Sequence, residues 1–81
     1  MELYISNLPF AATNEDLQPV CEAYGTVTRV NIVRDRATGR SKGFAFIEMP
    51  DRAQGEAAIA GLNGFQLMGR EIKAREAMPK R

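Results

Sequence analysis

Three aromatic side chains stand at alternating positions of two short segments in which the sequence predicts β-strands. Tyr4 lies within residues 3–8, and Phe44 and Phe46 lie within residues 42–49. Because successive side chains of a strand point to opposite faces, the rings lie opposite their aliphatic neighbours, which can form a core without them. An exposed ring offers a flat surface on which a nucleic-acid base can stack. With basic residues close by, this pattern predicts a surface that binds unpaired bases.

The elements that carry these rings follow from hydrophobic periodicity and from helix-capping residues. Residues 2–6 read as a strand, and Thr13 with Asp16 forms a capping-box-like start of a helix that we expect to end at Gly25. Pro19 lies inside this helix, where we expect a distortion. Residues 27–34 and 43–49 read as two further strands, joined by a polar turn.

The second half of the chain repeats this order with a helix and a final strand. Asp51 is the expected N-cap of a helix whose buried stripe consists of Gly55, Ala58, Ile59 and Leu62. A short hairpin over residues 65–69 leads to a last strand over residues 71–75. The order β-α-β-β-α-β predicts an α+β, ferredoxin-like fold with both helices on one face of a four-stranded antiparallel sheet.

One face of that sheet is then left uncovered, and alternation assigns the side chains that point to it. They are Tyr4, Ser6, Arg29, Asn31, Val33, Phe44, Phe46, Glu48, Lys73 and Arg75. Although the net charge is only +1, the charges are separated along the chain. All charged side chains of residues 1–28 are acidic, whereas residues 29–45 and 70–81 have a net positive charge. Such segregation predicts one basic side and one acidic side.

Length and composition limit the other classes of function. At 81 residues the chain is expected to form one domain, residues 1–81. A single cysteine, Cys21, precludes an internal disulfide, and the absence of histidine excludes a zinc site made of cysteine and histidine. Cys21 lies on the apolar helix stripe and is read as a core residue. We expect no cofactor.

Enzymatic activity is not expected, because the open face lacks histidine, paired carboxylates and a reactive cysteine. No apolar run reaches the roughly 20 residues needed to span a membrane, and no signal-peptide pattern follows Met1. We therefore expect a cytoplasmic location in a bacterium, and a nuclear or cytoplasmic location in a eukaryote.

Over nearly its whole length, the chain resembles the RNA recognition motif family. The shorter ribonucleoprotein motif of that family matches residues 3–8, and the longer one matches residues 42–49. Tyr24-Gly25, the turn between residues 35 and 43, and Leu62-Asn63-Gly64 are further marks of the family. The chain departs from the pattern at Met49, where an aromatic residue is usual, and at Pro19 and Gly55.

The resemblance implies that the chain binds single-stranded RNA and assigns roles to individual residues. Bases would stack on Tyr4 and Phe46, while Phe44 would pack against sugars and Lys42 would contact a phosphate. Residues of the last strand and those just after it would read base edges. The full set of expected RNA-binding residues is Tyr4, Phe44, Phe46, Lys42, Asn7, Asn31, Arg40, Lys73, Arg75 and Glu76.

Several alternatives stay open at the level of the sequence. The open face could instead bind another protein, and Phe65 with Met68 on the hairpin could form a partner contact or a weak dimer. Arg34, Arg36 and Arg40 fit a solvated loop as well as they fit phosphate contacts. The pattern does not separate RNA from single-stranded DNA.

Overall fold

The computed structural model describes residues 1–77, and their elements follow the predicted order. These are β1 (Glu2–Ser6), α1 (Asn14–Glu22), β2 (Arg29–Arg34), β3 (Ser41–Glu48), α2 (Arg52–Leu62) and β6 (Lys73–Glu76). A small hairpin of β4 (Gln66–Leu67) and β5 (Arg70–Glu71) lies between α2 and β6. Lys80 and Arg81, which contribute to the basic terminal block of the sequence, lie outside the described residues.

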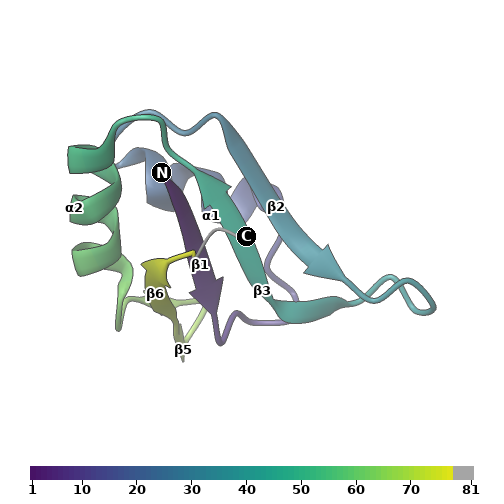
Figure 1. Ribbon diagram of the computed structural model, residues 1–81. Coiled ribbons are helices and arrows are strands. Elements are labelled where there is room, and N and C mark those ends of the chain that lie inside the picture. Colours follow the sequence, from purple (N-terminus) through teal and green to yellow (C-terminus); the bar gives the residue numbers. More distant parts are fainter. Residues whose placement is uncertain (78–81) are drawn as a thin grey trace.

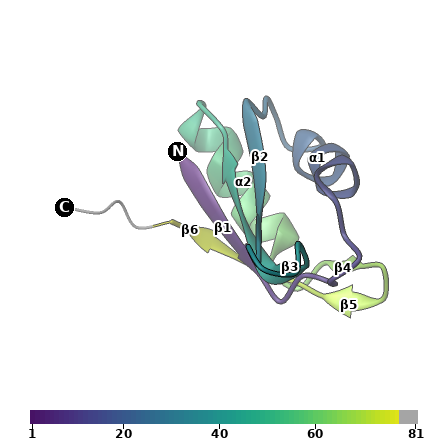
Figure 2. The ribbon, with the colours of Figure 1, turned by 90° about the vertical axis from the view of Figure 1, so that its right-hand side faces the viewer.

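The main sheet has the strand order β2-β3-β1-β6, and every neighbouring pair is antiparallel. Figure 1 shows this sheet with α1 behind it, and Figure 2, turned by 90°, shows both helices on the same side. The opposite face carries no helix. The predicted ferredoxin-like fold is therefore confirmed, and the two central strands, β1 and β3, are the ones that carry the aromatic rings.

Local capping interactions explain where the two helices begin. The Thr13 hydroxyl accepts the Asp16 backbone N–H, and the Asp16 carboxylate accepts the Thr13 backbone N–H in return, which completes a capping box. The Asp51 carboxylate accepts the backbone N–H of Gln54 at the start of α2. Helix α1 continues through Pro19 and reaches its C-cap at Ala23, two residues before the expected end at Gly25.

The core lies between the helices and the covered face of the sheet. Leu3 and Ile5 of β1, Ile47 of β3, Leu17 of α1 and Leu62 of α2 are all fully buried. Met49, where the family pattern has an aromatic residue, is also completely buried. The expected inward stripe of α2 is found, with only Ile59 partly exposed.

Gly55 has a packing reason that the sequence does not reveal. A Cβ atom at this position would collide with the side chain of Met1, which lies against α2 in the space that the glycine leaves. The glycine weakens the helix, since glycine is less favourable than alanine in a helix interior by about 1 kcal/mol. The gain is that Met1 packs against the core.

The structure changes the predicted boundaries mainly in the C-terminal quarter of the chain. The expected strand over residues 71–75 is divided, because Glu71 pairs with Gln66 in the hairpin whereas residues 73–76 pair with β1. Ile72, between the two strands, is fully buried as expected. In the described part of the chain, residues 1–77, no helix is long and apolar enough to cross a membrane.

Candidate nucleic-acid interface

The three rings predicted to share a face lie together at the centre of the open face. In the strand register Tyr4 faces Phe46, and Ser6 faces Phe44. The ring centroid of Tyr4 is 5.4 Å from that of Phe46 and 5.7 Å from that of Phe44. The two phenylalanines approach edge to face at 6.5 Å, with an interplanar angle of 87°. These distances are typical of aromatic pairs that stabilise one another.

All three rings are only partly buried, although they form a cluster. Their helix-side neighbours in the same strands, Ile5 and Ala45, have no exposed surface. The rings are thus held in place by mutual contact and by the sheet below them, while part of each ring stays accessible. Such a group of fixed and accessible rings can accept flat ligands without a large rearrangement.

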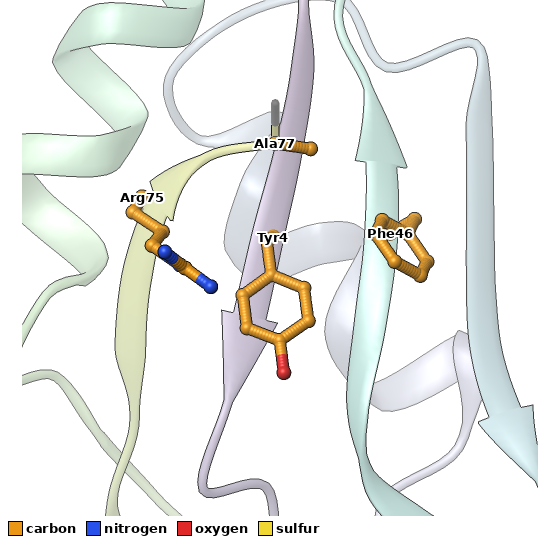
Figure 3. A pocket seen from close by; sticks show the side chains of 4 residues that line it. All are labelled: Tyr4, Phe46, Arg75 and Ala77. Atoms are coloured by element: carbon orange, nitrogen blue, oxygen red, sulfur yellow. The ribbon is translucent and has the colours of Figure 1, made fainter. Parts of the chain in front are cut away.

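Arg75 adds a cation to this cluster. Tyr4 and Arg75 are register partners across β1 and β6, and the guanidinium carbon lies 4.8 Å from the centroid of the Tyr4 ring. Figure 3 shows the guanidinium directed at the tyrosine ring, with Phe46 on the other side of Tyr4. This geometry fits a cation–π contact, which places a positive charge beside the Tyr4 ring.

A shallow cavity marks this part of the sheet. It has a volume of about 280 Å³ and is lined by Tyr4, Phe46, Arg75 and Ala77, as Figure 3 shows. Three of these residues come from three neighbouring strands, and Ala77 follows directly after β6. Sequence patterns did not point to Ala77, because a small residue at the end of a strand gives no chemical signal.

The remaining predicted residues of the open face border the ring cluster. Asn31 of β2 faces Phe46 in the register and is exposed. Lys73 faces Ser6 on the other side and forms an ion pair with Glu71, with 3.5 Å between Nζ and Oε2. Lys42 is exposed in β3, two residues before Phe44. The structure therefore brings these three residues around the rings.

Arg40 lies further away, in the loop that joins β2 to β3. The loop is closed by hydrogen bonds from the Asp35 N–H to the Arg40 carbonyl and from the Gly39 N–H to the Asp35 carbonyl. The backbone N–H groups of Ala37 and Thr38 also donate to the Asp35 carboxylate, which lowers its pKa. The loop thus has a defined backbone, and the Arg40 side chain is exposed beside it.

Asn7 and Glu76, two further predicted site residues, also have partners within the protein. Asn7 adopts a left-handed backbone conformation, with φ of 60°, and its side chain is bound to the β5 segment by Arg70 and by the carbonyl of Glu71. Glu76 was expected to follow the last strand, but it is part of β6 and faces Leu3 in the register.

The register explains where the Glu76 side chain goes. Leu3 points to the core, so the residue paired with it lies on the helix side of the sheet, and the Glu76 carboxylate accepts from Arg52 of α2 at 3.2 Å. The structure therefore does not bring Glu76 to the open face. The expected end of the last strand at residue 75 was one residue too early, because β6 includes Glu76.

Charge is distributed unevenly along the open face. At the end of β1 where the chain enters the sheet, Glu2 faces Glu48 across the strands, and Arg29 lies beside them. Lys73 and Lys42 lie toward the opposite end, where β1 leaves the sheet. The open face is thus basic at one end and mostly acidic at the other.

The chemistry expected of metal or redox sites is missing from residues 1–77. No group of three or more acidic or cysteine side chains is arranged to hold a metal ion there. Burial raises the pKa of the Cys21 thiol from 9.0 to about 11, so little reactive thiolate forms at neutral pH. Cys21 is a core residue, as predicted.

Comparison with known protein families now identifies the domain. The model of the RNA recognition motif family matches residues 3–73, which include both helices and the strands from β1 to β5 and end at the first residue of β6. The chain belongs to the RNA recognition motif family. Family membership agrees with the prediction that the chain is not an enzyme, since the domain is a binding module.

Individual relatives support this assignment. The chain is 48% identical to the "Putative RNA-binding protein RbpF" of Nostoc sp., over 99% of this chain and 76% of that protein. The crystal structure of RNA Binding Protein PG1 superposes with a TM-score of 0.93 at 37% identity, over 100% of this chain and 98% of that one.

A solved complex is also similar. The structure of the Rna15 RNA recognition motif with bound RNA (GU) has a TM-score of 0.86 at 35% identity, over 96% of this chain and 83% of that one. The same fold therefore holds RNA in a protein of related sequence.

Proposed function

We propose that the open face of the sheet binds a short segment of single-stranded RNA, about three or four nucleotides long. The observation that carries this proposal is the cluster of Tyr4, Phe44 and Phe46, which stays accessible on the sheet face that no helix covers. Each base offers a π-face, and stacking one base on a protein ring contributes about 1–3 kcal/mol. A relative described as RNA-binding and an RNA-bound neighbour of the same fold support the proposal.

The three rings have different proposed roles. Tyr4 and Phe46 are the base platforms, since both line the shallow cavity and their centroids are 5.4 Å apart. Phe44 lies outside that cavity, 5.7 Å from Tyr4, and supports the sugar side of the bound strand. A base entering above Tyr4 meets the Arg75 guanidinium beside the ring and gains a second contact surface.

The polar residues around the rings supply the remaining contacts. We propose that Lys42 and Lys73 meet phosphates, while Arg75 and Asn31 read base edges; Arg40 reaches a phosphate only if the strand extends toward the β2–β3 loop. Asn7 acts through the position that it gives to Arg70. Glu76 has no part in the proposed interface, because it is bound to Arg52 on the other side of the sheet.

The direct test is a binding titration of labelled single-stranded RNA against Phe46→Ala. We expect the dissociation constant to rise by about fivefold to a hundredfold, because one stacking surface of about 1–3 kcal/mol is removed. Phe65→Ala is the matched control, since Phe65 is also a partly exposed phenylalanine but lies at the hairpin. Equal affinity of Phe46→Ala and the unmodified chain would contradict the stacking proposal.

Salt dependence tests the proposed phosphate contacts separately. Two or three contacts predict a slope of log K against log salt of about −0.7 for each contact on a single strand. A much steeper slope would show that the arginine residues of the β2–β3 loop carry more of the binding. Deoxyribonucleotide probes of the same sequence measure the contribution of the 2′-hydroxyl groups.

A second candidate function is binding of a protein partner or of a second copy through the β4–β5 hairpin. It is favoured by Met68, which is 58% exposed, and by Phe65, which is 38% exposed. Replacing both with serine and measuring the mass in solution by light scattering tests this candidate. Loss of a dimer with RNA binding retained would establish the hairpin as a separate surface, and a monomer before and after the change would exclude a dimer there.

We further propose that residues 1–81 act as one binding domain and that the protein works where single-stranded RNA is present, in the cytoplasm of a bacterium. Fluorescence microscopy of a tagged chain in the source cell tests the location. Uniform cytoplasmic signal is expected, and a signal restricted to the cell envelope would contradict it.

A further inference from the structure

A fourth aromatic ring is exposed outside the open face. Phe10 lies in the loop between β1 and α1, and 66% of its surface is accessible, more than for Phe65 or Met68. A phenylalanine side chain is normally buried, and so much exposed aromatic surface has an energetic cost in water. The neighbours of Phe10 indicate what it could bind.

Arg70 of β5 is held next to this ring. Its guanidinium carbon lies 6.0 Å from the Phe10 centroid. The same guanidinium donates from Nε and one Nη atom to the Asn7 side-chain oxygen, at 3.2 and 3.0 Å. The Asn7 amide in turn donates to the backbone carbonyl of Glu71. Hydrogen bonds between residues 63 positions apart in the sequence therefore hold the Arg70 guanidinium beside the exposed Phe10 ring.

This cation forms no ion pair within residues 1–77, in contrast to Lys73 and Arg52. Only part of its donor set is used by Asn7, since a guanidinium has five N–H groups. A fixed guanidinium with donors to spare is suited to a phosphate, which accepts two parallel hydrogen bonds from it. Phe10 and Arg70 together offer a base-stacking surface and a phosphate contact.

The cluster is connected to the ring-bearing strands. The Leu8 N–H donates to the Gly43 carbonyl at 2.9 Å, and a ring carbon of Phe10 would lie only 3.6 Å from a Cβ atom at Gly43. Gly43 lies near the start of β3, between Lys42 and Phe44, and has a left-handed φ of 89°. Phe10 is thus located at the end of the sheet where β1 ends and β3 begins, near Phe44.

The charges on the open face favour an RNA strand that leaves the sheet at this end. The opposite end of the open face carries two carboxylates, Glu2 and Glu48, with one cation, Arg29. Lys42 and Lys73, of which Lys73 is paired with Glu71, lie toward the end where Asn7 follows β1. Figure 2 shows the β4–β5 hairpin and the β1–α1 loop next to each other at this end of the sheet. A strand lying on the three rings is therefore drawn toward Arg70 and Phe10.

We propose that Phe10 and Arg70 form an additional nucleotide subsite, in which a base of the same single-stranded RNA stacks on Phe10 while its phosphate contacts Arg70. The inference rests on the proposed function, because the strand must first lie on the sheet. Asn7 is a positioning residue of this subsite. An RNA of about three nucleotides fills the sheet alone, and a longer RNA bends around the edge to reach Phe10.

The chain contains no tryptophan, so Phe10→Trp introduces a single fluorophore at the subsite. We expect an eight-nucleotide RNA to quench this tryptophan by stacking, whereas a three-nucleotide RNA of the same base leaves it unchanged. Phe65→Trp is the matched control and is expected to respond to neither length. Homopolymers of adenine, cytosine and uracil are first compared, and the one that binds the unmodified chain most tightly serves as the probe.

Affinity measurements make the test independent of fluorescence. Phe10→Ala is expected to weaken binding of the eight-nucleotide RNA by about five- to tenfold, at the lower end of base stacking, and to leave the three-nucleotide RNA unaffected. Arg70→Gln is expected to reduce the salt slope for the longer RNA by about 0.7. Because Phe10 is exposed, Phe10→Ala and Phe10→Trp are expected to melt at the temperature of the unmodified chain.

The possible failures can be told apart. Unchanged affinity of Phe10→Ala for the longer RNA, or an unquenched Trp at position 10, overturns the subsite while Phe46→Ala still tests the sheet. If Phe46→Ala binds the three-nucleotide RNA as tightly as the unmodified chain does, the proposed function itself is overturned. Quenching of the introduced tryptophan by added unlabelled protein without RNA would show self-association at this cluster and would also overturn the subsite.

Discussion

The two faces of the same sheet differ in what their side chains do, although they alternate residue by residue. Along β1, Leu3 and Ile5 are completely buried against the helices, whereas Tyr4 between them is partly exposed on the open side. Along β3, Ala45 and Ile47 are buried and Phe44 and Phe46 are not. Aliphatic residues thus hold the domain together on one face, and aromatic residues remain available for a ligand on the other.

This difference has a consequence for energetics. The covered face gains stability because its apolar surface is removed from water on folding, at about 25 cal/mol for each Å². Much of the corresponding surface on the open face stays in contact with water until a ligand arrives. Changes on the covered face are therefore expected to reduce the free energy of unfolding, and changes on the open face to reduce affinity.

The largest effect is expected for Ile5→Ala on the covered face. Removing a fully buried isoleucine side chain leaves a cavity and is expected to lower the free energy of unfolding by about 2–5 kcal/mol. Urea denaturation followed by circular dichroism measures this loss. The comparison between the faces fails if Tyr4→Ala, next to it in the strand, destabilises the domain by as much.

Alkaline pH tests the covered face without a change of side-chain volume. The Cys21 thiol has its pKa raised to about 11 in the folded chain, against an ordinary value of 9.0, because burial disfavours the thiolate and the nearby Glu22 adds to this effect. Its contribution to stability is fully present below pH 9 and is lost as pH rises through 11, by at most about 3 kcal/mol.

Other groups also titrate in this range, so Cys21→Ala is the reference. The difference in free energy of unfolding between the unmodified chain and this variant is expected to shrink from pH 8 to pH 11. Parallel pH profiles would mean that the thiol stays accessible to solvent.

On the open face, Tyr4→Ala is expected to raise the dissociation constant for RNA by about tenfold to a hundredfold, because it removes a base platform. Tyr4→Phe keeps the ring and is expected to bind nearly as well as the unmodified chain. Isothermal titration calorimetry gives both values. A large loss for Tyr4→Phe would assign the binding to the hydroxyl group instead of to stacking.

The smallest changes in affinity and stability are expected at Arg75 and Glu76, two neighbouring residues whose side chains lie on opposite faces of the sheet. Arg75 contacts the Tyr4 ring on the open side, whereas Glu76 pairs with Arg52 on the covered side. Arg75→Gln is expected to weaken RNA binding severalfold, and Glu76→Gln to leave it unchanged, with only a slight fall in melting temperature because the ion pair is exposed. Equal losses of affinity would mean that this alternation does not separate the two roles.

The repeating features of the domain could be predicted from the sequence. Alternation in residues 2–6 and 43–49 placed the rings on one face, and the capping residues Thr13 and Asp51 located the helix starts correctly. These signals are local, since a strand or a helix start is encoded within a few residues. The family resemblance and the predicted fold are confirmed, whereas the contacts of individual residues with RNA remain predictions.

What could not be predicted depends on contacts between distant residues. Asn7 and Arg70 are 63 positions apart in the sequence but form a hydrogen bond, because the end of β1 and the β4–β5 hairpin lie at the same end of the sheet. No local sequence pattern reveals this contact. Phe10 lies in a loop without periodicity, so its exposure follows only from the structure. Glu76 was expected just after a strand ending at residue 75, but β6 extends through it, and the register with Leu3 directs its side chain to the helix side.

The buried Cys21 thiol makes the domain convenient for site-specific labelling. It is the only cysteine of the chain, it is fully buried, and its raised pKa keeps it almost entirely protonated at neutral pH. Maleimide reagents react with thiolates, so a second cysteine introduced at an exposed position would be modified selectively. A dye attached in the β2–β3 loop could then report the approach of a labelled RNA without removal of the native cysteine.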